Sequence, residues 1–337
     1  MKYQTFSKAV LCCSLVLLVV ASANIQAQPS GSRRGGLYGD WQIKVEFGER
    51  QMQAILSFSR DSEGNLTAQW ISPFGATQLK EVKYEDNKLS FVQFVKFGDN
   101  EFTSNFKGTV EDGKLMGTLS SDRGESKVEG QRAPRIPRAV GDWEMKFKVG
   151  DRDVTANLVI GADKEGNLTG QWKSQWGEHQ ITDVAYERGT LTFKRKSKIQ
   201  DRELESTFEG RVQGDTLSGT IKSERGEIPV EGQRVGGALI GTWNLDVEAE
   251  WGKIKQRLRV NPDMSALYGS TPVKKVSLDG DKVSFKIALE FGDQKFEMNF
   301  AGKLEDSKLT GEMTTSRGNQ KITGTKVVRR SPRRPSM

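Results

Sequence analysis

The chain repeats one pattern three times, at an interval of about a hundred residues, and this limits the fold to one module used in tandem. Each copy opens with Gly-x-Trp and closes with Gly-x-Arg or Gly-x-Lys. The openings and closings are Gly39-Asp40-Trp41 with Gly130-Gln131-Arg132, Gly141-Asp142-Trp143 with Gly232-Gln233-Arg234, and Gly241-Thr242-Trp243 with Gly324-Thr325-Lys326. The inner motifs that recur in order are, in copy two, Leu191-Thr192-Phe193, Phe208-Glu209-Gly210 and Leu217-Ser218-Gly219. So many matches in a fixed order indicate duplication.

The alternation of apolar and polar residues predicts strands throughout each copy. Apolar residues occupy every second position from Trp143 to Val149, which is the period of a half-buried strand. Glycine-containing turns, such as Asp279-Gly280 and Arg225-Gly226, separate runs of this kind. We therefore expect an all-β fold with about eight short strands in each copy.

The charges of one expected hairpin support this interpretation. With a turn at residues 200–202, Lys196 lies opposite Glu205 and Lys198 lies opposite Glu203. Opposite charges that face each other across antiparallel strands are favourable by roughly 0.2–1 kcal/mol per pair. This basic strand is accordingly interpreted as a solvent-facing sheet surface, and we expect no specific nucleic-acid partner.

The segments between the copies contain proline or glycine and are interpreted as linkers. The expected division is a signal peptide at 1–27, a flexible basic leader at 28–37, repeats at 38–132, 140–234 and 240–328, linkers at 133–139 and 235–239, and a basic tail at 329–337. Copy three is shorter, and we expect it to lack the counterpart of Gly166–Trp172 and the loop after it. We expect three separately closed domains. A faint half-repeat within each copy leaves a six-bladed propeller as the alternative.

The amino-terminal segment has the layout of a secretory signal peptide. Lys2 and Lys8 precede an apolar run over residues 9–23, with small residues after it. This run is shorter than the roughly 20 residues that a spanning helix needs. Both cysteines, Cys12 and Cys13, lie in the same segment. We therefore expect an exported mature chain, periplasmic or extracellular, with no disulfide and no transmembrane segment.

The net charge of +7 belongs to the two ends of the chain. Eight basic residues account for it: Lys2, Lys8, Arg33, Arg34, Arg329, Arg330, Arg333 and Arg334. Without them the rest of the chain has a charge of −1. A basic tail can dock on anionic envelope polymers, whereas a solvated tail without a specific partner fits the sequence equally well.

The ends of each copy resemble the pattern of the calycins, the lipocalins and fatty-acid-binding proteins. In those barrels a basic residue at the end of the last strand lies across the tryptophan of Gly-x-Trp and closes the barrel floor. The matching pairs here are Trp41 with Arg132, Trp143 with Arg234, and Trp243 with Lys326. The resemblance implies three tandem antiparallel eight-stranded up-and-down barrels, similar to lipocalin-like repeats of unknown function in exported bacterial proteins. Each copy is shorter than a typical lipocalin and shows no helix after its last strand.

The residues needed for common catalytic sites are largely missing from the sequence. His179 is the single histidine, and we expect it to be an exposed loop residue beside a turn. No nucleophile elbow and no phosphate-binding loop occur. We expect no cofactor, no metal and no enzymatic activity, although the many carboxylates leave a hydrolase as a third hypothesis.

A ligand site in copies one and two is the leading functional hypothesis. Trp70 and Trp172 share an expected inward face, and Phe74 and Trp176 follow in the next turn. Aromatic rings at a barrel mouth can hold an apolar ligand or a glycan. The two tryptophans can also simply fill a small barrel. Arg195 is expected to point inward, where it either meets an anionic ligand or extends out of the barrel end.

Two non-enzymatic functions therefore remain open from the sequence. The first is a binding protein of the cell envelope that holds a small apolar ligand or a glycan by its barrel aromatics. The second is a structural or interaction scaffold whose basic tail, Arg329, Arg330, Arg333 and Arg334, docks on anionic envelope polymers.

Overall fold

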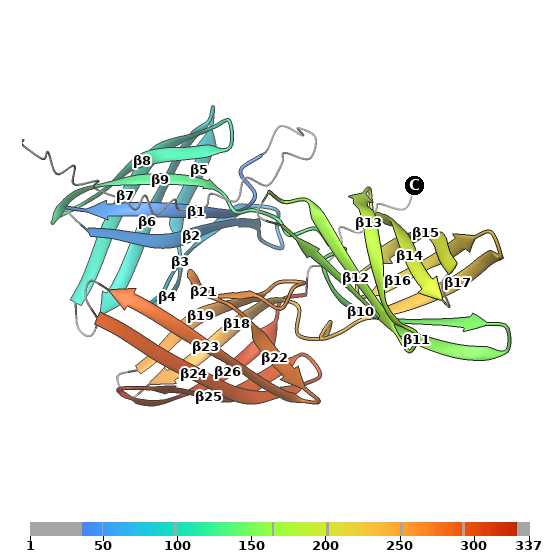
Figure 1. Cartoon of the computed structure of the whole chain (residues 1–337). Helices are drawn as coiled ribbons and strands as arrows, with labels where there is room; N and C mark the ends of the chain where they lie inside the picture. The colour runs from blue at the N-terminus through green and yellow to red at the C-terminus, as the bar shows by residue number, and fades with distance from the viewer. Residues whose placement is uncertain are drawn as a thin grey trace, which may run out of the picture.

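The computed structural model describes residues 36–48, 50–97, 100–163, 165–199, 202–249, 252–291 and 294–328, and all of their regular structure is β (Figure 1). The expected signal peptide and the basic tail lie outside the described residues. The strands form three successive sheets, one for each repeat. We call these sheets barrel 1, barrel 2 and barrel 3.

The strand bounds follow the repeats closely. Barrel 1 contains β1 (Gly39–Phe47), β2 (Arg50–Arg60), β3 (Leu66–Ser72), β4 (Gly75–Gln78), β5 (Lys80–Glu85), β6 (Lys88–Phe97), β7 (Asn100–Glu111), β8 (Lys114–Ser121) and β9 (Gly124–Arg132). Barrel 2 contains β10 (Gly141–Val149), β11 (Arg152–Ala162), β12 (Leu168–Ser174), β13 (Gly177–Glu187), β14 (Thr190–Ile199), β15 (Arg202–Gln213), β16 (Thr216–Ser223) and β17 (Gly226–Arg234). Barrel 3 contains β18 (Gly241–Ala249), β19 (Gly252–Val260), β20 (Ala266–Tyr268), β21 (Thr271–Val273), β22 (Val276–Asp279), β23 (Lys282–Phe291), β24 (Gln294–Glu305), β25 (Lys308–Thr315) and β26 (Gly318–Lys326).

The topology confirms the prediction of three tandem barrels. Barrel 2 is closed, with its eight strands in sequence order and β10 paired to both β11 and β17. In barrels 1 and 3 the strand that corresponds to β13 is interrupted, which gives β4 and β5 in one and β21 and β22 in the other. The interruption in barrel 1 is one residue long, and the Leu79 N–H still bonds the Ala68 carbonyl. Because each sheet runs through a whole repeat, the six-bladed propeller is wrong.

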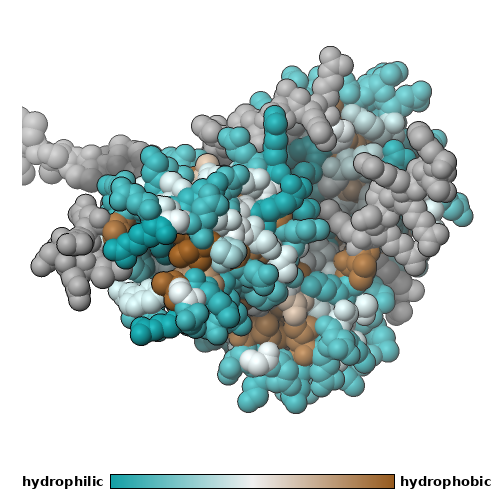
Figure 2. Space-filling model, turned by 90° about the vertical axis from the view of Figure 1, so that its right-hand side faces the viewer, coloured by the Kyte–Doolittle hydropathy of each residue, from teal (hydrophilic) through white to brown (hydrophobic). Residues whose placement is uncertain are grey.

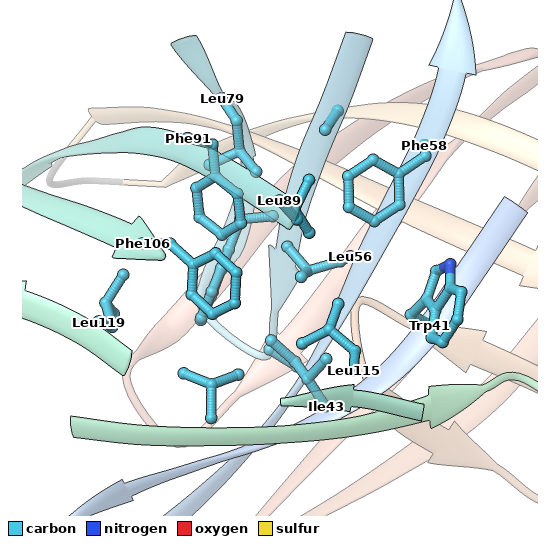
Figure 3. Packing of buried hydrophobic residues seen from close by; sticks show 14 of the residues in the cluster. Trp41, Ile43, Leu56, Phe58, Leu79, Leu89, Phe91, Phe106, Leu115 and Leu119 are labelled. Carbon is cyan, nitrogen blue, oxygen red and sulfur yellow. The ribbon is translucent and has the colours of Figure 1, made fainter. Parts of the chain in front are cut away.

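The inner repeat motifs build the middle of each core. The phenylalanines of the first two motifs stack on each other at 4.6–4.7 Å between ring centroids, as Phe193 and Phe208 do in barrel 2. Figure 3 shows the equivalent Phe91 and Phe106 side by side in barrel 1. Gly210 lies opposite Gly219 beneath this stack. A Cβ on Gly210 would lie 2.5 Å from the Phe208 ring, so glycine leaves the room that the ring fills.

The expected tryptophan–cation pairs are in contact at the floor of all three barrels. The Arg132, Arg234 and Lys326 cations lie 4.8, 3.9 and 5.6 Å from the ring centroids of their tryptophans. The indole N–H of each tryptophan donates to the carbonyl of the residue four positions earlier, at 2.8–2.9 Å. These acceptors, Leu37, Ala139 and Leu239, are buried. Leu37, Ala139 and Leu239 belong to the segments predicted as a leader and as linkers, but they pack against the barrel floors.

The short hairpin of barrel 3 corrects one expectation. Tyr268 lies opposite Leu258 in barrel 3, just as Trp172 lies opposite Leu158 in barrel 2. The counterpart of Trp172 is therefore present. The pairing of β19 with β20 is instead shorter at both ends than the pairing of β11 with β12. The hairpin that β20 forms with β21 has the two-residue turn Gly269-Ser270 at its tip.

Barrels 1 and 3 pack directly against each other, and β4 lies beside β19 (Figure 1). Arg257 of β19 donates from both Nη atoms to the Asp40 carboxylate of β1, at 3.1 and 3.0 Å. Arg259 donates to the same carboxylate at 2.7 Å. The Arg257 and Asp40 side chains are 6% and 13% exposed, so the pair is largely desolvated. We call this contact the clasp.

The tip of the β3–β4 hairpin completes the clasp. Gln256 donates to the Ser72 carbonyl at 3.1 Å, and Ser270 donates to the Gln53 carbonyl at 2.9 Å. Gly269 comes so close that an added Cβ would lie 2.3 Å from the Ser72 carbonyl oxygen. The shortened hairpin of barrel 3 therefore leaves the space that the hairpin of barrel 1 occupies.

Apolar side chains on the outer face of barrel 1 are buried near the clasp. Ile55 and Ile71 face each other across β2 and β3, and both are at most 2% exposed although neither belongs to the interior cluster. Their counterparts in barrel 2 are Asn157 and Lys173, which are exposed. Barrel 2 therefore lacks the outer surface that barrel 1 uses for docking.

We predict that Asp40→Ala opens the clasp. Burial alone would raise the pKa of Asp40, but the charge of Arg257 and the hydrogen bond from Ser57 outweigh it and lower this pKa. Without the carboxylate, two arginines stay at the interface unpaired, at a cost of about 3 kcal/mol. Calorimetry should show a lower midpoint for barrels 1 and 3, and small-angle scattering a larger maximum dimension. The control is Asp142→Ala, the exposed equivalent in barrel 2; equal effects of the two variants would contradict the clasp.

Candidate ligand site at the mouth of barrel 2

The four aromatic residues of the ligand hypothesis separate into two pairs. Trp70 and Trp172 are 3% and 1% exposed and belong to the interior clusters of barrels 1 and 2. Phe74 and Trp176 are 63% and 48% exposed at the tips of the equivalent hairpins. The buried pair fills the barrels, while the exposed pair stands at their rims.

Arg195 points into barrel 2 from β14. Its guanidinium carbon lies 5.0 Å from the Trp172 ring centroid, and its Nε donates to the Ser206 hydroxyl at 3.2 Å. Ser206 itself is 8% exposed. In the part of the chain that the structure describes, no carboxylate pairs with Arg195 and its two Nη atoms have no protein acceptor. Arg195 is thus an inward cation that lacks a counter-ion in the described residues.

The prediction that His179 is an exposed loop residue is wrong. His179 lies in β13, directly opposite Trp172, and is 9% exposed. Its Nε2 is 3.1 Å from the Ser174 hydroxyl, while its Nδ1 is buried and has no hydrogen-bond partner among the described residues. The tight turn after Ser174 reverses the chain, and this places residue 179 on the inner face.

These side chains gather at one end of barrel 2, opposite the Trp143 floor. We call Ser174, His179, Arg195, Ser197 and Ser206 the mouth cluster. The Trp172 indole N–H beneath it is also buried without a partner. A buried polar group that stays unpaired costs about 1–3 kcal/mol. The mouth of barrel 2 therefore holds two unsatisfied groups next to an uncompensated cation.

The other two barrels differ at the same positions. Gln93 in barrel 1 and Ile287 in barrel 3 replace Arg195, as the shared strand registers show. Met298 of barrel 3 takes the place of Ser206. Barrel 3 is therefore apolar where barrel 2 is charged, and the mouth cluster distinguishes barrel 2 within a common fold.

The electrostatics of the mouth cluster follow from burial. Burial lowers the pKa of Arg195 from its ordinary value. Burial and, second, the positive charge of Arg195 hold the pKa of His179 below its ordinary value. The inward neighbours Trp172, Ser174 and Ser206 carry no charge. The imidazole is therefore neutral at pH 7 and can donate or accept through its free nitrogen.

A surface hollow on the outer side of barrel 2 borders the mouth cluster, because Arg195 and Ser206 are among the residues that line it. It has a volume of about 530 Å³ and runs over the exposed outer side chains of β13 to β16. Lys194 pairs there with Asp183 at 2.8 Å, and Lys196 pairs with Glu205 at 2.9 Å. The second pair confirms the predicted hairpin register. These charges already have partners.

Three further observations concern the described chain as a whole. On the face shown in Figure 2, hydrophobic residues form a few groups among predominantly hydrophilic ones. Among the described residues no cluster of three or more histidine, cysteine or acidic side chains is placed to hold a metal ion. No helix in that part of the chain is long and apolar enough to cross a membrane.

We predict that Arg195→Gln raises the pKa of His179. The substitution removes a positive charge that opposes protonation of the imidazole, and glutamine already occupies the equivalent position of barrel 1. His179 is the single histidine of the chain, so selective ¹³C labelling gives one resonance to titrate. Lys194→Gln, an equal charge change on the outer face, should leave the titration unchanged. Identical titration curves of His179 in the wild type and in Arg195→Gln would contradict an electrostatic effect of Arg195 on His179.

Comparisons with known proteins give distant likenesses. No protein-family model matches the chain, and no curated protein does. A Bacteroides fragilis protein provisionally assigned to the outer membrane is 12% identical with a TM-score of 0.23, over 86% of this chain and 97% of that one. A protein of unknown function from Nostoc punctiforme is 10% identical with a TM-score of 0.22, over 86% and 96%. Transferrin-binding protein B from Haemophilus parasuis is 10% identical with a TM-score of 0.19, over 87% and 76%. These likenesses carry no argument about function.

Proposed function

We propose that the protein is an exported, non-enzymatic binding protein of the cell envelope that holds a small ligand at the mouth of barrel 2. The observation that carries this proposal is the pair of buried, unpartnered groups, Trp172 Nε1 and His179 Nδ1, beside Arg195. Polar groups at such depth are normally hydrogen-bonded. A ligand that supplies the missing acceptors would satisfy them.

The rim of barrel 2 offers a further contact for such a ligand. Trp176 lies two residues after Ser174 in the β12–β13 turn, and its backbone N–H bonds the Ser174 hydroxyl. Its side chain is about half exposed. An exposed indole at the edge of a polar mouth suits an apolar group or a sugar ring, which stacks on the aromatic face. The proposed ligand is therefore polar at one end and ring-like or apolar at the other.

Barrels 1 and 3 support this function as a scaffold. Their interiors are filled by core side chains, and the clasp joins them through Asp40 and Arg257. The Ser72 carbonyl of barrel 1 lies against Gln256 and Gly269 at the rim of barrel 3. Barrel 2 has no equivalent contact at its mouth among the described residues. The clasped pair would hold barrel 2 with that mouth accessible.

Export and envelope attachment belong to the same proposal. The signal-like segment of residues 1–27 and the tail arginines lie outside the described residues, so they support it by sequence alone. The tail would retain the protein at an anionic surface in a salt-sensitive manner. The filled barrels equally favour the second candidate, a scaffold without a ligand, and one experiment separates the two.

We predict that the full chain, purified after export, carries a bound small molecule. Native mass spectrometry should show an excess mass that disappears on denaturing extraction, and the extracted compound then identifies the ligand. Arg195→Gln should purify with its bare mass, whereas the matched control Lys194→Gln should keep the excess. A bare wild-type mass that also stays bare after incubation with small molecules from the producer's envelope would favour the scaffold.

A further inference from the structure

We propose that the ligand of barrel 2 carries a carboxylate that pairs with Arg195, and that its binding draws a proton onto His179. This inference rests on the proposed function and adds the chemical class of the ligand. It also adds a pH dependence that a neutral sugar or a purely apolar ligand would not have.

The guanidinium of Arg195 is preorganised for a carboxylate. Its Nε is fixed on Ser206, and its face lies over the Trp172 ring, so the side chain is held from two sides. The two Nη groups remain without an acceptor among the described residues. A guanidinium presents its N–H groups as a planar fork that matches the two oxygens of a carboxylate.

The two buried arginines Arg234 and Arg257 show what Arg195, which is partly exposed, lacks. Arg234 and Arg257 are both 5% exposed, and each pairs with a carboxylate of the chain. Arg234 lies 3.3 Å from Asp215, and Arg257 lies 3.0 Å from Asp40. Arg195 also points inward but is less buried, and it has no such partner in the described residues. A ligand carboxylate would supply the missing charge.

The neighbouring lysines do not share this role. Lys194 and Lys196 flank Arg195 in β14, but their side chains are on the outer face and pair with Asp183 and Glu205. Among the described residues, the mouth cluster therefore provides one permanent positive charge, that of Arg195. One such charge matches the single negative charge of a carboxylate better than the double charge of a phosphate monoester.

The coupling to a proton follows from the position of His179. Its charged neighbour from the strands packed around it is Arg195 of β14, while Ser174 of β12 and Ser206 of β15 are neutral. An anion at Arg195 offsets the positive charge that opposes protonation of the imidazole. Ligand binding and protonation then favour each other, so the affinity rises as the pH falls.

Acetate tests this inference against acetamide, its neutral isostere. With ¹³C-labelled His179 in the full chain, sodium acetate should shift the single imidazole resonance in a saturable way, compared with sodium chloride at equal ionic strength. Acetamide should not. The acetate affinity should rise severalfold between pH 7.5 and pH 5.5, approaching tenfold for each unit by which acetate raises the pKa of His179. Calorimetry in buffers of different ionisation enthalpy should show proton uptake.

Two variants make the result decisive. Arg195→Gln should abolish the acetate effect and Lys194→Gln should keep it, with thermal unfolding as the control for folding. Equal responses to acetate and acetamide, an acetate response that survives Arg195→Gln, or no acetate response at all would each overturn the carboxylate assignment. The proposed function is decided separately by the mass excess of the purified protein.

Discussion

The contact between the opening tryptophan and the closing cation is the constraint on which each barrel depends. A meander of antiparallel strands has two free edges, and pairing the first strand with the last removes both in barrel 2. In barrels 1 and 3 the same pairing leaves one break in the sheet, between β4 and β5 and between β21 and β22. In every copy the indole N–H is tied to the preceding segment, while the cation from the last strand lies over its ring. Because the residue four places before each tryptophan accepts this hydrogen bond, the end of each preceding segment is packed against the barrel that follows it. The barrels are therefore joined without long flexible connections in the described chain.

A few differences in outward-facing and inward-facing residues distinguish the three barrels, although they share one fold. Ile55 and Ile71 make an outer face of barrel 1 apolar, and the clasp covers that region with barrel 3. Polar residues at the same positions leave barrel 2 exposed there. Inside the barrels, one position is glutamine, arginine or isoleucine in copies one, two and three. Arg195 is partly exposed, so solvent reaches it, and it has no carboxylate partner among the described residues.

The sequence was sufficient for the fold, because the repeat supplies every local pattern three times and the calycin resemblance suggests how the strands close. It was also sufficient to mark Arg195 as an inward cation, since its counterparts are neutral. To predict the position of His179, one must know which residues form the tight turn after Ser174. An error of one residue moves a side chain to the opposite face of a strand. The clasp joins residues far apart in the chain. The contrast between Ile55 and Asn157 signalled a covered face but not which barrel covers it.

The central claim is that the mouth of barrel 2 is a ligand site built around Arg195 and His179. The most direct test is the single ¹³C-labelled imidazole resonance of the full chain, recorded before and after adding the low-molecular-mass fraction of the producing cells' envelope. We expect the resonance to move in the wild type and in Lys194→Gln and to stay in place in Arg195→Gln. A resonance that stays in place in the wild type, or moves equally in Arg195→Gln, would contradict that claim.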